Sequence, residues 1–192
     1  MKIAIDLDDV LALSLIDFID FYNEKFEKKI TLEDFTGFSL NESIGMPIEK
    51  ERKLLEEYDA SHHYDKIKPM EGAKEAIKEL SENHELVIVT SRPQKREEQT
   101  RKWLENYIEG IKEVFFIRQE YGGESKTKGE VCKEIGAELL IEDNLDYAES
   151  CVDEGIRVLL FDYPYNQEEN ISPSITRVKS WKEVLKNLKT SQ

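Results

Sequence analysis

Residues 86–93 read Leu-Val-Ile-Val-Thr-Ser-Arg-Pro, four apolar residues followed directly by polar ones. Because no polar residue alternates with the apolar ones, this stretch predicts a strand that is buried on both faces. Similar apolar runs occur along the chain at residues 2–8, 114–117, 139–141 and 158–161. Helical segments alternate with them at 72–83, 94–108, 128–136, 145–154 and 180–189. This alternation predicts an α/β fold, a Rossmann-like three-layer α/β/α structure with a parallel sheet.

The stretch between the first strand and residue 68 departs from this alternation. It reads as a helix over 14–28, short helices and loops over 31–47, and a charged helix over 48–59. Aromatic residues are frequent in it, either as ordinary core or as the lining of a cleft. We therefore expect a core domain of residues 1–13 and 69–192, with residues 14–68 inserted after the first strand as a small helical cap.

Composition limits the classes of partner. The chain has 192 residues and a formal net charge of −14, and 39% of its residues are hydrophobic, enough for one domain with a sizeable core. An acidic chain lacks the basic face that a nucleic-acid polymer requires, but a metal ion or a local lysine can offset the charge of a small anionic substrate.

No run approaches the ~18 apolar residues of a membrane span. Cys132 and Cys151 do not form a Cys-x-x-Cys pair, so we expect reduced thiols and a cytoplasmic protein.

Polar side chains follow several predicted strands at the point where each strand ends. The carboxyl ends of parallel strands meet at one edge of a sheet, which is where such folds bind ligands. One such residue alone could be a turn or helix cap, and Arg92 could lie in a surface turn instead of contacting substrate. Several strand ends together favour a shared site. Its candidates are Asp6, Asp8 and Asp9, then Thr90, Ser91 and Arg92, then Glu142, Asp143 and Asn144.

These residue types suit phosphoryl chemistry. Asp6 and Asp8 are two residues apart, so both side chains can face one point, where Asp143 joins them from another strand. Hard oxygen donors without His or Cys favour Mg²⁺ over zinc. One carboxylate could attack phosphorus while the other transfers protons. Thr90 or Ser91 could donate to phosphoryl oxygens, and a nearby lysine would neutralise their charge.

Together these residues resemble the haloacid dehalogenase-like (HAD) phosphohydrolases over nearly the whole chain. That family has Asp-x-Asp after the first strand, Thr or Ser after a later apolar strand, Lys near the start of a helix, and an acidic pair after the next strand. All four motifs occur here in order. A closer resemblance, to the 5′(3′)-deoxyribonucleotidase branch, rests on the cap position and on residues 6–11, 68–73, 160–166 and 180–184.

The resemblance implies a role for each site residue. Asp6 would be the nucleophile that forms an aspartyl-phosphate. Asp8 would be the acid that protonates the leaving group and then the base that activates water. The side chains of Asp6 and Asp143 and the backbone carbonyl of Asp8 would hold Mg²⁺. Thr90 would bind the phosphoryl oxygens, with Ser91 beside it.

The lysine of the third motif has several candidates. Lys128 opens a helix, where the family places this residue, so we expect Lys128 rather than Lys126 to act. Lys133 lies inside that helix and is expected to face solvent. Glu142 stands where many relatives have Asp, so Asp143 is the expected ligand and Glu142 a supporting or water-mediated partner.

We therefore expect a Mg²⁺-dependent phosphomonoesterase for a small phosphorylated metabolite, first of all a (deoxy)nucleoside monophosphate. The alternative substrate is a sugar phosphate or another non-nucleotide ester, because a fold does not choose among substrates. A protein that binds a phosphate ligand without turnover is a second alternative, and a receiver-like signalling module is a third. Receivers carry their phospho-accepting Asp after the third strand, where this chain has Ile117-Arg118-Gln119. A homodimer is left open.

Overall fold

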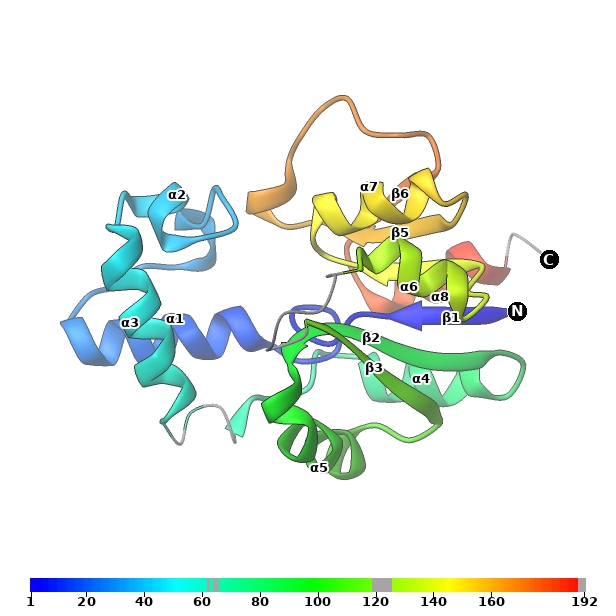
Figure 1. Cartoon of the computed structure of the whole chain (residues 1–192), viewed down its shortest axis with the longest axis horizontal. Coiled ribbons are helices and arrows are strands. Elements are labelled where there is room, and N and C mark those ends of the chain that lie inside the picture. Colours follow the sequence, from blue (N-terminus) through cyan, green and yellow to red (C-terminus); the bar gives the residue numbers. More distant parts are fainter. Residues whose placement is uncertain (62, 64–65, 119–125, 190–192) are drawn as a thin grey trace.

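The computed structural model describes residues 1–61, 63, 66–118 and 126–189. These residues contain a six-stranded sheet in the order β3-β2-β1-β4-β5-β6, with every neighbouring pair parallel (Figure 1). The strands are β1 (Lys2–Ile5), β2 (Glu85–Pro93), β3 (Ile111–Arg118), β4 (Leu139–Glu142), β5 (Arg157–Phe161) and β6 (Ile175–Val178). The order reverses between β1 and β4, and ligands of such sheets bind at the carboxyl ends next to that reversal.

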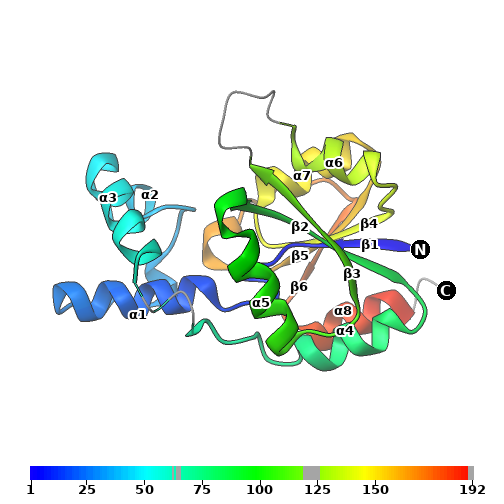
Figure 2. The ribbon, with the colours of Figure 1, turned by 60° about the horizontal axis from the view of Figure 1, so that its bottom comes forward.

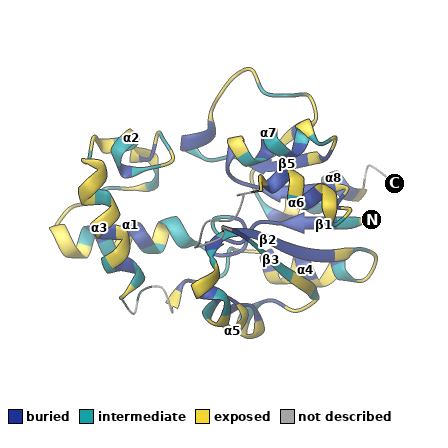
Figure 3. Cartoon of the chain, viewed as in Figure 1, coloured by how far each residue is buried: buried dark blue, intermediate teal, exposed yellow. Residues whose placement is uncertain are grey.

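Helices cover both faces of the sheet, as Figure 2 shows. Alternate strand residues face opposite sides, so Ile3 and Ile5 belong to one hydrophobic cluster and Ala4 to the other. One face packs against α4 (Ala73–Ser81), α5 (Glu97–Tyr107) and α8 (Trp181–Lys189), and the other against α6 (Lys128–Glu134) and α7 (Leu145–Asp153). The strands form the buried middle layer (Figure 3). The predicted three-layer parallel α/β fold is confirmed.

The observed strands differ from the predicted ones at several points. No strand was predicted at β6, in which only the first and last residues are buried. β1 ends at Ile5 rather than at residue 8, and β3 begins at Ile111 rather than at residue 114. β2 does not end at residue 89 but continues through residues 90–92, and its Pro93 pairs with Arg118 of β3 after a register shift. The polar residues 90–92 therefore belong to the strand and not to a turn after it.

A separate group of helices lies beyond the carboxyl ends of the strands (Figure 1). It consists of α1 (Ser14–Phe26), the 3-10 helix η1 (Leu32–Asp34), α2 (Leu40–Ile44) and α3 (Ile48–Asp59). These elements share a hydrophobic cluster, to which Tyr165 contributes from beyond β5. The chain leaves and re-enters the core side by side, because Ala12 pairs with Pro69 and the Leu13 amide donates to the Lys68 carbonyl at 2.9 Å. No helix among the described residues has the length and apolar character needed to cross a bilayer.

Candidate active site

Asp6 follows β1 directly and lies buried where the strand order reverses. Its backbone amide donates to the Ile141 carbonyl at 2.9 Å, which extends the pairing with β4 by one residue and orients the side chain. Its carboxylate oxygen Oδ1 accepts a hydrogen bond from Lys128 Nζ at 2.8 Å. Asp6 is 5% exposed and Lys128 is fully buried, so each charge depends on the other for compensation.

Lys128 reaches the site because it is the first residue of α6. Thr127 caps this helix by accepting from the Glu130 amide, and the Glu130 carboxylate accepts from the Thr127 amide. The Lys128 ammonium also donates to Glu142 Oε2 at 2.7 Å. Burial lowers the pKa of Lys128, but the charges of Asp6 and Glu142 outweigh burial and raise it, so the ammonium stays protonated.

The other two candidate lysines lie outside this cluster. Lys126 is exposed and its ammonium pairs with Glu134. Lys133 is also exposed and pairs with Glu154. Of the three lysines that precede the acidic pair, the structure brings only Lys128 to Asp6.

Glu142 and Asp143 follow one another at the end of β4. Glu142 Oε1 accepts from the backbone amides of Asp143 and Asn144, at 3.2 and 3.0 Å, and its Oε2 accepts from the buried ammonium. Both oxygens of Glu142 therefore already bind protein groups. Asp143 Oδ2 accepts from the Tyr165 hydroxyl at 2.8 Å. Carboxylate oxygens of Asp6, Glu142 and Asp143 lie within 4.8 Å of one another.

Negative charge exceeds positive charge in this region. Burial, reinforced by neighbouring carboxylates and opposed by Lys128, raises the pKa of Asp6 to about 7. Burial, again with neighbouring carboxylates, raises the pKa of Asp9 to about 8 and that of Asp143 well above its usual value. The acidic residues are Asp6, Asp8, Asp9, Glu142 and Asp143, and the basic ones are Arg92 and Lys128.

This donor set fits a hard divalent cation. The cluster offers carboxylate oxygens and contains neither His nor Cys, the combination that suits Mg²⁺. A divalent ion would also offset the excess of negative charge that raises these pKa values. Asp6 and Asp143 lie together as the predicted ligand set requires. The Asp8 carboxylate is not part of this cluster and is bound by Arg92 instead.

The carboxylate of Asp8 is held by Arg92 of β2. Arg92 Nε lies 2.8 Å from Oδ2, and Nη2 lies 2.5 Å from Oδ1. The Ser14 hydroxyl also donates to Oδ1, and Arg92 Nη1 donates to Thr100 Oγ1 at 3.3 Å. Burial raises the pKa of Asp8, but Arg92 and the Ser14 hydrogen bond outweigh burial and hold it below its usual value. The surface-turn alternative for Arg92 is wrong, because this side chain is 4% exposed.

Thr90 and Ser91 precede Arg92 on β2. Thr90 is 1% exposed, and its Oγ1 accepts from the Arg92 amide at 3.1 Å. Ser91 is half-buried and borders open space. It lines a cavity of about 380 Å³ together with Ile117, Lys126, Thr127, Lys128, Asp146, Tyr147 and Ser150.

Asp9 was a candidate without an assigned role, and Tyr165 and Asn166 were not predicted as site residues. Asp9 has a φ of 56°, and its Oδ1 accepts from the Leu15 amide at 2.9 Å, which ties α1 to the site. Tyr165 and Asn166 contact Asp143 from the segment after β5. Their signal was the Tyr-Pro-Tyr-Asn run after a strand end, which supported the family resemblance without indicating a contact.

Comparisons with known proteins agree with this geometry. Residues 1–191 match the family described as 5′ nucleotidase, deoxy (pyrimidine), cytosolic type C protein. A nucleotidase of Clostridium acetobutylicum is 27% identical over 184 residues, which cover 96% of this chain and 91% of that protein. A 5′(3′)-deoxyribonucleotidase of Bacillus subtilis is 27% identical over 188 residues, 97% of each chain. A haloacid dehalogenase-like hydrolase from Streptococcus pneumoniae has a TM-score of 0.70 over 97% of each chain at 15% identity, which shows the shared fold.

The family match covers nearly the whole chain, as did the resemblance drawn from the four motifs. That resemblance is confirmed, and with it the class of enzyme. The chain belongs to the family of deoxy (pyrimidine) 5′-nucleotidases of cytosolic type C, which are HAD-like phosphoric monoester hydrolases.

Proposed function

We propose that this protein is a cytoplasmic Mg²⁺-dependent phosphatase that hydrolyses a (deoxy)nucleoside monophosphate through an aspartyl-phosphate on Asp6. The observation that carries the proposal is the buried cluster in which Lys128 contacts Asp6 and Asp143 lies beside it. The proposed nucleophile Asp6, the cation Lys128 and the proposed metal ligand Asp143 therefore lie together, which supports this reaction.

The proposed reaction has two displacements at phosphorus. A carboxylate oxygen of Asp6 attacks phosphorus as the ester P–O bond breaks, and the leaving alkoxide takes a proton from Asp8. Water then attacks phosphorus, loses a proton to Asp8, and releases phosphate as the bond to Asp6 breaks. The Asp6 and Asp143 side chains and the Asp8 carbonyl would hold Mg²⁺, which would supply positive charge to the phosphoryl oxygens.

Other residues of the chain would prepare these steps. Lys128 orients Asp6 and opposes the rise in its pKa that burial causes, and Thr90 and Ser91 supply hydroxyl groups for phosphoryl oxygens. The bond to Arg92 stabilises ionised Asp8, the form required of the base in the second displacement. The acid step requires Asp8 to gain a proton and to loosen from Arg92 when the substrate enters.

Residues 14–68 would act as a cap that selects the substrate. Phe38 of this segment is 59% exposed, and its ring meets that of Tyr165 edge-on at 5.7 Å. Since Tyr165 contacts Asp143, an aromatic pair lies beside the proposed metal site. This placement supports a substrate with a planar base next to its phosphate.

The test is phosphate release from 5′- and 3′-nucleoside monophosphates and from sugar phosphates, with Mg²⁺ and with excess chelator. We expect release from nucleotides that chelation abolishes and that Asp6→Asn loses by several orders of magnitude, with a normal fold. Asp153→Asn, an exposed acid of α7, is the matched control and should keep full activity. Release from sugar phosphates alone would reject the nucleotide substrate, and an active Asp6→Asn would reject the covalent mechanism.

A further inference from the structure

The segment after β5 binds Asp143 at two different atoms. The Tyr165 hydroxyl donates to the carboxylate oxygen Oδ2 at 2.8 Å, and the Asn166 side-chain amide donates to the backbone carbonyl at 2.6 Å. Tyr165 is 8% exposed, Asn166 1% and Asp143 4%, so water does not compete strongly for these bonds. Both the backbone and the side chain of Asp143 are therefore held from one side.

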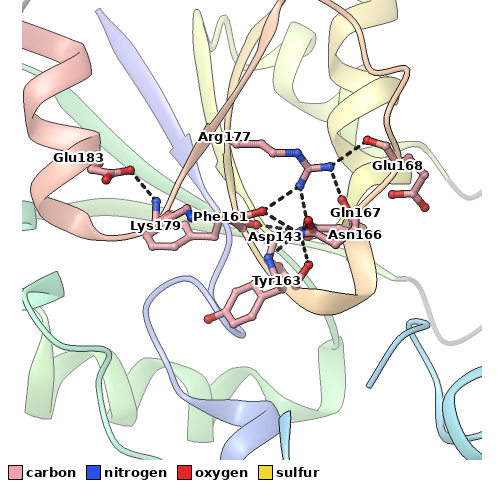
Figure 4. A network of polar contacts seen from close by, with 10 residues as sticks. Asp143, Phe161, Tyr163, Asn166, Gln167, Glu168, Arg177, Lys179 and Glu183 are labelled. Carbon is pink, nitrogen blue, oxygen red and sulfur yellow. Dashed lines mark hydrogen bonds and ion pairs between the residues drawn. The ribbon is translucent and has the colours of Figure 1, made fainter. Parts of the chain in front are cut away.

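The orientation of the Asn166 amide is determined by its neighbours. Its Oδ1 accepts from Arg177 Nη1 at 2.6 Å and from the Tyr163 amide at 3.2 Å, while its Nδ2 also donates to the Phe161 carbonyl at 2.8 Å (Figure 4). An arginine has donors only, so it must face the amide oxygen, and the amide nitrogen must face the carbonyls. Arg177 of β6 thereby fixes the segment that carries Tyr165.

We infer that Tyr165 is a positioning residue for the metal site, because its hydroxyl fixes the carboxylate of Asp143 in one orientation. The inference rests on the proposed function, in which Asp143 holds Mg²⁺. Carboxylates that ligate metals are themselves held by hydrogen bonds, and loss of such a partner typically lowers metal affinity about 10- to 100-fold. Without the Tyr165 hydroxyl, the Asp143 carboxylate would rotate between several orientations. Mg²⁺ binding would then have to restore the one orientation that ligates the ion, which lowers the affinity.

Tyr163 provides a matched control within the same segment. Its ring stacks on that of Tyr165, with centroids 5.1 Å apart and planes 8° apart. Its hydroxyl donates to the backbone carbonyl of Asp9 at 2.9 Å and not to Asp143. Tyr163→Phe and Tyr165→Phe thus delete the same atom from two adjacent stacked rings, and only the second deletion removes a bond to Asp143.

The experiment measures Mg²⁺ binding by isothermal titration calorimetry on the full chain, without substrate. We expect Tyr165→Phe to raise the Kd for Mg²⁺ about 10-fold or more, and Tyr163→Phe to leave it within about twofold. In turnover assays, Tyr165→Phe should raise the Mg²⁺ concentration for half-maximal rate, while kcat at saturating Mg²⁺ changes less than about threefold. If Tyr165 had a purely structural role, Tyr165→Phe would lower the folded fraction of the protein. The Mg²⁺ affinity of the folded molecules would then stay unchanged.

Each outcome separates the inference from the proposed function. Equal Mg²⁺ affinities for wild type and Tyr165→Phe would overturn the inference and leave the proposed function standing. Absence of Mg²⁺ binding to the wild type would overturn both. A second measurement applies should Tyr165→Phe fail to fold: Mg²⁺ should change the near-ultraviolet tyrosine absorbance of the wild type and of Tyr163→Phe to the same extent. No tyrosine signal in either protein would overturn the inference.

Discussion

The guanidinium of Arg92 holds both carboxylate oxygens of Asp8, with Nε 2.8 Å from Oδ2 and Nη2 2.5 Å from Oδ1. Two parallel hydrogen bonds between planar groups fix the rotation of the carboxylate as well as its position. Arg92 is itself buried and donates to Thr100, so the pair is anchored on the β2 side. A side chain predicted to bind substrate is, in this arrangement, one that orients the proposed acid and base.

Replacing Arg92 distinguishes these two roles. A lysine carries the charge but cannot make the two-pronged contact, so Arg92→Lys should leave Asp8 misaligned. We expect kcat to fall about 10- to 100-fold, with KM changed less than about threefold. Steady-state kinetics check this, with Arg96→Lys as control, because Arg96 pairs with Asp59 away from Asp8. A large rise in KM with an unchanged kcat would instead favour direct substrate binding by Arg92.

Lys128 and Lys126 offer a second comparison, since they are two residues apart and differ completely in burial. Lys128→Met leaves Asp6 and Glu142 buried without their shared cation, which typically costs about 3–5 kcal/mol of unfolding free energy. We expect kcat to fall by about 10³-fold or more, because the phosphoryl charge also loses its partner. Chemical denaturation and phosphate release measure the two effects.

Lys126→Met is the control for that prediction. Its ammonium pairs with Glu134 at the surface, where both side chains are more than half exposed. Exposed ion pairs contribute little to stability, so this variant should match the wild type in both assays. An inactive Lys126→Met beside an active Lys128→Met would reverse the assignment of the third-motif lysine.

Much of the core fold could be predicted because burial on both faces leaves a direct mark on the sequence. The strands β1, β2, β4 and β5 each contain a continuous apolar run, and each was located to within a few residues. The edge strand β6 has the sequence Ile-Thr-Arg-Val, with only its ends buried, so it carries no such mark. Its Arg177 is nevertheless the residue that fixes Asn166, a role that depends on the pairing of β5 with β6.

The site was predictable as a set of residues but not as a set of contacts. Strand ends marked Asp6, Thr90 and Asp143, because polar residues after apolar strands stand out. The pairing of Arg92 with Asp8 joins residues 84 positions apart, and it depends on β2 continuing past Thr90. Nothing in the sequence around Tyr165 distinguishes a hydroxyl bound to Asp143 from an ordinary core tyrosine.

Gly129 tests how closely α6 must approach α7. A Cβ atom at this position would lie 1.9 Å from the Ser150 carbonyl oxygen, closer than any real contact. Gly129→Ala must therefore push the two helices apart, which typically costs about 1–3 kcal/mol. Because Lys128 precedes Gly129, its ammonium should move from Asp6, and we expect kcat per folded molecule to fall about 10-fold or more.

Gly136→Ala separates that steric effect from general loss of stability. Gly136 has a φ of 72° with open space around it, so alanine strains the backbone by about 1–2 kcal/mol but displaces nothing. Both variants should lower the melting temperature, while only Gly129→Ala should lower kcat. Equal kcat values in the two variants would mean that α6 can shift without moving Lys128.

The raised pKa values of Asp6 and Asp9 predict how stability depends on pH when metal is removed. The folded pKa values are about 7 and about 8, whereas an unfolded Asp titrates near 3.9. Between these limits the folded state binds more protons than the unfolded one, so the unfolding free energy falls as pH rises. In excess chelator, the melting temperature should thus decrease from about pH 5 to about pH 8. Mg²⁺ should stabilise the protein more at the upper end, because it binds the ionised carboxylates.

Differential scanning calorimetry over this pH range, with and without Mg²⁺, tests the effect. Asp9→Asn is the informative variant, since asparagine keeps an oxygen acceptor for the Leu15 amide but removes one titrating group. It should flatten the slope in chelator, whereas Asp153→Asn on the surface should not. A melting temperature that stays constant or rises with pH in chelator would contradict the prediction. It would mean that Lys128 and Arg92 already compensate the buried carboxylates, so that no excess of negative charge would be left for a divalent ion to offset.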